Sequence, residues 1–78
     1  MIDLLFFAQL QEKVGSPKIT IEANDISIKE IKEKFLAKYK MDHLLNEAMI
    51  AVNEEYSKED AVVFSGDVVA FIPPVSGG

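Results

Sequence analysis

The chain has 78 residues, of which 49% are hydrophobic and 27% are charged, and its net charge is −5 at pH 7. A chain of this length forms one domain with a modest margin of stability. It contains no cysteine, which excludes disulfides, thiolate catalysis and cysteine-bound metal sites. Its eight cations are all lysine, and this acidic, arginine-free composition argues against nucleic acid or an anionic membrane as a partner.

The amino-terminal segment Ile2 to Ala8 predicts a strand that is apolar on both faces. It lacks the basic region of a signal peptide and is too short to span a bilayer, so we expect a cytoplasmic protein. Gln9 to Val14 predicts a helical turn, which Gly15-Ser16-Pro17 ends. Lys18 to Glu22 alternates with period two, which predicts a second strand paired with the first.

The main helix is predicted to begin at Ser27. Ser27 is a good N-cap residue, and Glu30 three residues later completes a capping box. The apolar residues of the helix follow the spacing of one buried stripe, formed by Ile28, Ile31, Phe35 and Tyr39. Met41 to Glu47 then reads as a connection with a short turn of helix.

The second half of the chain predicts three further strands: Ala48 to Val52, a short one at Tyr56, and Val68 to Ile72. With one main helix, this order predicts an α+β protein of the β-grasp (ubiquitin-like) type, a mixed sheet packed against that helix with the first and last strands adjacent and parallel. We expect residues 1–78 to form a single domain with a free tail at 73–78.

Both the first and last strands are apolar on two faces, although a sheet covered on one side needs only one apolar face. The surplus residues predict an apolar patch on the open face of the sheet: Leu5, Phe7, Val68, Ala70 and Ile72. Such a patch is typical of a partner surface, with Phe7, Ile72 and Tyr56 as its expected anchors. The alternatives are that loops cover these residues or that the two faces are assigned the wrong way round.

No catalytic or metal-binding pattern is recognisable in the sequence. The single histidine, His43, lies in a polar connection, and the acidic residues Glu54, Glu55, Glu59 and Asp60 lack the spacing of a calcium loop. We therefore expect no self-contained active site and no cofactor or metal bound by this chain.

The best candidate for a reactive group is the carboxylate of Gly78, which follows Gly77 at the end of the sequence. Pro73 and Pro74 make the preceding segment an extended spacer, and glycine lets the last residues pass through a narrow channel in a partner. The alternative is an inert, frayed end, and a diglycine arises by chance in about 0.5% of chains.

The carboxyl-terminal segment Ala70-Phe71-Ile72-Pro73-Pro74-Val75-Ser76-Gly77-Gly78 resembles that of the molybdopterin synthase small subunits, the MoaD sulfur carriers. Leu5-Phe6-Phe7-Ala8 and Ala51-Val52-Asn53 are similar to the same family at comparable positions.

The resemblance implies that a MoeB-type adenylyltransferase uses ATP to adenylate Gly78 and that a persulfide donor converts it to a thiocarboxylate. The tail, comprising Pro73, Pro74, Val75, Ser76 and Gly77, would then enter the large subunit, MoaE, within a heterotetrameric synthase. There it would donate sulfur to cyclic pyranopterin monophosphate and form the dithiolene of molybdopterin, so the chain would be enzymatic as a subunit.

Three other hypotheses remain open at this point. A sulfur carrier for thiamine thiazole synthesis shares the fold and the diglycine. A ubiquitin-like protein modifier would use the same activation chemistry to form an isopeptide bond through Gly78. A plain interaction domain would have an inert tail.

Overall fold

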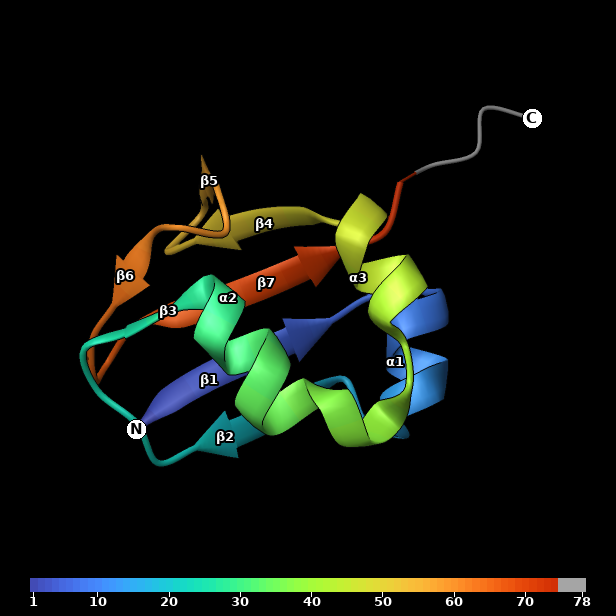
Figure 1. Ribbon diagram of the computed structural model, residues 1–78, viewed down its shortest axis with the longest axis horizontal. Helices are drawn as coiled ribbons and strands as arrows, with labels where there is room; N and C mark the ends of the chain where they lie inside the picture. Colours follow the sequence, from blue (N-terminus) through green and yellow to red (C-terminus); the bar gives the residue numbers. More distant parts are fainter. Residues whose placement is uncertain (75–78) are drawn as a thin grey trace.

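The computed structural model describes residues 1–74. Its centre is a five-stranded mixed sheet with the order β2-β1-β7-β4-β5 (Figure 1). These strands are β1 (Ile2–Phe6), β2 (Lys18–Ile21), β4 (Met49–Val52), β5 (Glu55–Ser57) and β7 (Val68–Ile72). β1 and β7 are adjacent and parallel, and the other pairs are antiparallel. The predicted β-grasp arrangement is confirmed.

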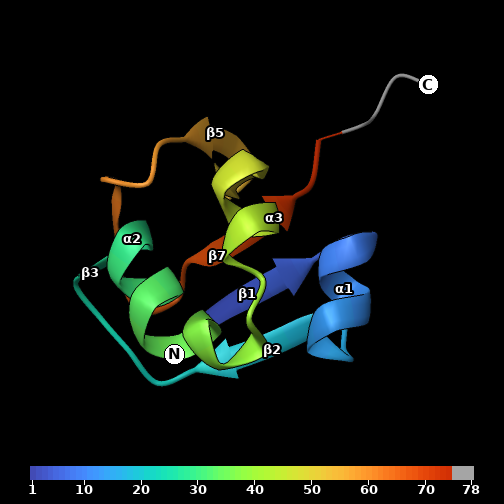
Figure 2. The ribbon, with the colours of Figure 1, turned by 45° about the vertical axis from the view of Figure 1, so that its right-hand side comes forward.

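Helical segments cover one face of this sheet. α2 (Ile28–Ile31) continues into a π-helical turn, η1 (Lys32–Leu36), and a 3₁₀ turn, η2 (Ala37–Tyr39), and is followed by α3 (Asp42–Glu47). α1 (Gln9–Val14) lies beside the sheet at the end where β1 and β7 finish (Figures 1 and 2). None of the helices described for residues 1–74 has the length and apolar character needed to span a membrane.

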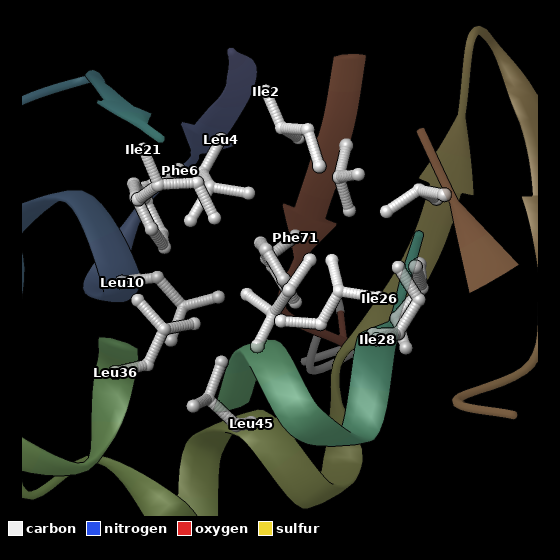
Figure 3. Packing of buried hydrophobic residues seen from close by; sticks show 14 of the residues in the cluster. Ile2, Leu4, Phe6, Leu10, Ile21, Ile26, Ile28, Leu36, Leu45 and Phe71 are labelled. Carbon is white, nitrogen blue, oxygen red and sulfur yellow. The ribbon is translucent and has the colours of Figure 1, made fainter. Parts of the chain in front are cut away.

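The core lies between the sheet and the helices (Figure 3). Its two largest side chains are Phe6 of β1 and Phe71 of β7, which are register partners and stack with ring centroids 5.6 Å apart. Ile2 and Leu4 point to the same side as Phe6 and are fully buried. The alternation predicted from the sequence therefore places the expected face of β1 against the helices.

The start of the main helix follows the predicted capping box. The Glu30 backbone N–H donates to the Ser27 hydroxyl (3.1 Å), and the Ser27 backbone N–H donates to the Glu30 carboxylate (3.3 Å). These bonds satisfy two donors that a helix amino terminus otherwise leaves free. The pKa of Glu30 is held below its ordinary value, first by the Ser27 backbone N–H, then by the Ser27 hydroxyl, which also donates to the carboxylate (3.2 Å), and then by Lys34.

The buried stripe of the main helix differs from the prediction after its first turn. Ile28 and Ile31 are fully buried as expected, but Leu36 is the next fully buried residue, and Phe35 and Tyr39 are only half-buried. The cause is η1, because a π-helical turn holds more residues than an α-helical turn and shifts the following side chains around the axis. As a result, Leu36 faces the core, where regular helical spacing would have placed Phe35.

Two connections are more ordered than the sequence predicted. Residues 42–47 form the helix α3, which buries Leu45 against the core. The sequence also gave no sign of β3 (Ile26–Ser27) and β6 (Val62–Val63), which form a separate two-stranded ladder. Two-residue strands carry too little periodicity to be recognised before their partner is known.

Candidate functional site

The face of the sheet opposite the helices carries a shallow depression of about 630 Å³. Along β1 and β7, residues alternate between fully buried and half-buried, which shows that the surplus apolar side chains point away from the helices. The predicted assignment of faces is confirmed. We call the apolar lining of this depression the outer patch: Leu5, Phe7, Ala51, Tyr56, Val68, Ala70 and Ile72.

The register of the sheet explains why these residues form one surface. Leu5 pairs with Ala70, Ala70 with Ala51, and Ala51 with Tyr56, so one row crosses four strands. Small alanine side chains in the middle of the row make the surface concave, and larger side chains stand around them.

The three predicted anchors all line the outer patch. Phe7 is 45% exposed and Tyr56 is 72% exposed, while Ile72 is half-buried. Large aromatic side chains this exposed show that residues 1–74 do not fold over the patch. Exposed aromatic groups around an apolar hollow are typical of a docking surface.

The outer patch lies beside the point where the chain leaves the sheet. Phe7 and Ile72 directly follow Phe6 and Phe71, the last register partners of the parallel pair β1 and β7, so both lie at the same end of the sheet. The sequence predicts a free tail from residue 73, and the structure describes only the first two residues of that segment. Pro73 is buried in the body of the domain and so offers little surface to a partner, whereas Pro74 is exposed.

The remaining predicted tail residues, Val75, Ser76, Gly77 and Gly78, lie outside the described residues. Their predicted roles as spacer and reactive group therefore stay predictions.

A strained residue adjoins the patch at Ala8. Its backbone has φ 51° and ψ −125°, a conformation that glycine adopts without the steric cost that a Cβ brings. The Leu10 N–H donates to the Phe7 carbonyl at 3.1 Å, which closes a tight turn around Ala8. This turn ends the β1 segment and fixes the direction in which Phe7 leaves it. No local pattern in the sequence indicates this turn.

A polar network borders the other end of the patch. Asn53 and Glu54, which also line the depression, both have positive φ in the turn between β4 and β5. The Asn53 side chain accepts from the Val68 N–H and donates to the Asp67 carboxylate, both at 3.0 Å. These bonds fix the turn against the start of β7. Nothing in the sequence indicated the role of Asn53 in holding this turn.

The Asp67 carboxylate is the most strongly bonded acid of this network. It accepts the Phe64 backbone N–H at 2.8 Å in addition to the Asn53 amide. These two bonds, the first above all, hold the pKa of Asp67 below its ordinary value. Asp67 is therefore ionised at neutral pH and acts as a structural acceptor.

Nothing in the outer patch has the character of a catalytic site. Its apolar lining is bordered only by Asn53 and Glu54, and no cluster of metal-ligating side chains occurs in residues 1–74. A second hollow, on the helical side, is lined mainly by charged residues, and there Lys32 is paired with Glu59 at 3.4 Å. His43 is exposed on α3. The apolar depression has the character of a surface that binds a partner.

Fold and site together define a ubiquitin-like β-grasp domain with an exposed apolar depression next to the carboxyl-terminal end of its sheet. The structure of SAMP1 from Haloferax volcanii is similar in fold, with a TM-score of 0.83 at 21% identity, covering 99% of this chain and 98% of that one. The model of the ThiS family matches residues 4–78, and the chain belongs to this family.

Several curated relatives of the chain are named as sulfur carrier subunits. It is 35% identical over 81 residues to the molybdopterin synthase sulfur carrier subunit of Escherichia coli, and 33% identical over 82 residues to that of Haemophilus influenzae, with full coverage of both chains in each case. It is 32% identical to the Drosophila melanogaster subunit, covering 99% of this chain and 90% of that protein.

One similar structure comes from an assembly. It is a chain from a protein–protein complex of subunits 1 and 2 of the molybdopterin-converting factor of Helicobacter pylori. The TM-score is 0.70 at 27% identity, covering 99% of this chain and 97% of that chain. The comparisons support a small carrier domain of the kind that works within a sulfur-transfer complex.

Proposed function

We propose that this chain is the sulfur carrier subunit of molybdopterin synthase and that the Gly78 carboxylate is the group that carries the sulfur. The observation that carries the proposal is the match, over the full length of both chains, to relatives of that name in Escherichia coli and Haemophilus influenzae. The described residues are consistent with it, because they form an exposed apolar depression beside the exit of the chain.

Activation is needed because a carboxylate is a poor electrophile with a poor leaving group. A MoeB-type adenylyltransferase would join the Gly78 carboxylate oxygen to the α-phosphorus of ATP and release pyrophosphate. A persulfide sulfur on a donor protein then forms a bond to the acyl carbon as the bond to AMP breaks. A thiol of the activating system cleaves the resulting S–S bond and leaves the thiocarboxylate. The chain itself has no cysteine, so the sulfur comes from outside.

Transfer takes place in a pocket of the large subunit, of the MoaE type. The thiocarboxylate is a soft nucleophile that is ionised at neutral pH. Its sulfur attacks a carbon of cyclic pyranopterin monophosphate and forms a carbon–sulfur bond as a carbon–oxygen bond of the substrate breaks. Water then cleaves the acyl–sulfur bond and regenerates the Gly78 carboxylate, and two such transfers complete the dithiolene. Groups that bind the substrate and move protons belong to the large subunit, and two copies of each chain form the synthase in the cytoplasm.

The outer patch is the surface that docks on the large subunit in this proposal. Phe7, Tyr56 and Ile72 would occupy the centre of the interface, and the Pro74 backbone would lead the tail into the partner. These side chains are exposed to water before docking and are buried by the partner afterwards. Burial of apolar surface is the main source of affinity in such interfaces.

The test is reconstitution with ATP, a MoeB-type adenylyltransferase and a sulfide source. Intact-mass analysis should show a gain equal to the difference between one sulfur and one oxygen atom, and the loaded protein should support molybdopterin formation with the large subunit. A variant lacking Gly78 should retain the fold and docking but lose loading. Molybdopterin formation by that truncated variant would show the proposal to be wrong.

The same assays address the other carriers and modifiers. Loading followed by sulfur transfer to a thiazole precursor, without molybdopterin formation, would indicate thiamine synthesis. A ladder of covalent conjugates in an immunoblot of cell extract would indicate a protein modifier. The likeness to SAMP1, at 21% identity, concerns the fold alone.

A further inference from the structure

Met49 places an exposed thioether on the same side of the sheet as the outer patch. It is the first residue of β4 and is 47% exposed. The next residue, Ile50, is buried beneath the helices, and Ala51 lines the outer patch, so Met49 and Ala51 share the open face of the sheet.

Met49 also lies next to the exit of the chain. Its register partner on β7 is Ile72, which lines the outer patch and precedes the buried Pro73. Met49 does not line the depression itself but a neighbouring hollow, and Tyr56 lines both. A partner that covers Ile72 and Tyr56 is therefore expected to reach the Met49 side chain.

The other two methionines differ from Met49 in ways that make them useful references. Met41 is only 2% exposed and belongs to the core. Met1 is 60% exposed, but it precedes β1 and so lies at the opposite end of that strand from Phe7, where its carbonyl accepts the Gly66 N–H at 2.8 Å. Exposure and proximity to the docking surface coincide at Met49.

We propose that Met49 is a site of reversible oxidation that lowers the affinity of the carrier for the synthase large subunit, an inference that rests on the proposed function. A hydroperoxide transfers one oxygen atom to the Met49 sulfur, forming an S–O bond as the O–O bond breaks. The sulfur loses two electrons, and the peroxide is reduced to an alcohol or water. A thiol-dependent methionine sulfoxide reductase restores the thioether: two thiols supply the two electrons and become a disulfide, and the oxygen leaves as water.

The physical effect of the oxygen atom is to place a strong hydrogen-bond acceptor in an apolar contact. The thioether is soft and apolar, whereas the sulfoxide holds water that the partner must remove. An acceptor left without a donor in an interface is costly, and we expect affinity to fall roughly ten-fold or more.

The experiment compares the full chain and its Met49→Leu variant before and after mild treatment with hydrogen peroxide. Peptide mass mapping locates the oxidised residues, and calorimetry measures the affinity of each sample for the large subunit. The result for each protein is the ratio of its affinities after and before treatment, so a difference in affinity between the two untreated proteins does not affect the comparison. Since Met1 is oxidised in both proteins, the difference between their ratios isolates Met49.

The inference predicts that Met49 and Met1 are oxidised, that Met41 is not, and that only the protein with Met49 loses affinity. Recovery after treatment with a methionine sulfoxide reductase would support reversibility. Resistance of Met49 to oxidation overturns the inference, as does an equal change of affinity in both proteins. Failure of the untreated full chain to bind the large subunit refutes the proposed function and this inference with it.

Discussion

Replacing Phe7 by aspartate should weaken binding to the large subunit while leaving the domain folded. Phe7 is 45% exposed, so folding removes about half of its surface from water. Full burial of a phenylalanine side chain contributes about 1.5–3 kcal/mol, and the substitution should therefore cost about 1–1.5 kcal/mol. A domain of this length has a total stability of about 4–12 kcal/mol, which leaves a folded protein.

The loss of affinity should be larger than the loss of stability. Loss of an aromatic anchor at the centre of an interface costs about 2–4 kcal/mol of binding free energy, which raises the dissociation constant roughly 30- to 700-fold. The assay is calorimetric titration with the large subunit, accompanied by thermal unfolding of each variant.

Two other phenylalanines provide matched controls. Phe64 is 51% exposed but does not line the outer patch, so Phe64→Asp should lose similar stability and keep its affinity. Phe6→Asp should unfold the domain, because Phe6 is 1% exposed and stacks on Phe71. Equal affinities for the Phe7 and Phe64 variants would refute the assignment of the docking surface, and unfolding of the Phe7 variant would place that residue in the core.

Three further predictions concern stability. In urea unfolding, Leu36→Ala should cost about 2–5 kcal/mol and Phe35→Ala clearly less, because only Leu36 is fully buried; the reverse order would contradict the π-helical turn. Because the pKa of Asp67 is lowered in the folded state, its ionised carboxylate stabilises the fold above the unfolded pKa near 3.8, and this contribution is lost as the pH falls through the folded pKa. Asp67→Asn should therefore make the urea midpoint less dependent on pH below about 4. An unchanged pH dependence would show that the Asp67 bonds are not its cause. Ala8→Gly should relieve its backbone strain and raise stability by about 1 kcal/mol, or the melting temperature by about 4–8 °C, whereas a lower melting temperature would show that Ala8 is not strained.

Local rules were enough for the order of the elements and for the two faces of the central strands. Ser27 and Glu30 specify the start of the main helix because a capping box involves only neighbouring residues. The doubled apolar character of β1 and β7 identified the outer patch, since alternation assigns every second side chain to one face whatever the partner strands are. Two of its members lie on other strands: Ala51 is on β4, which pairs with β7, and Tyr56 is on β5, which pairs with β4. The fold class supplies the places of both strands.

Features that depend on contacts between distant residues required the tertiary structure. The π-helical turn that buries Leu36 in place of Phe35 has no local signature, because packing of the helix against the sheet and α3 selects which residue turns inward. The burial of Pro73, the strain at Ala8 and the anchoring of Asn53 on Val68 likewise arise only when β1, β4 and β7 are brought together. Sequence alone determined which side chains lie on the open face of the sheet, because side-chain alternation is a property of each strand. The tertiary structure decided where that face ends and where the chain leaves the sheet, because those positions depend on how the strands are aligned.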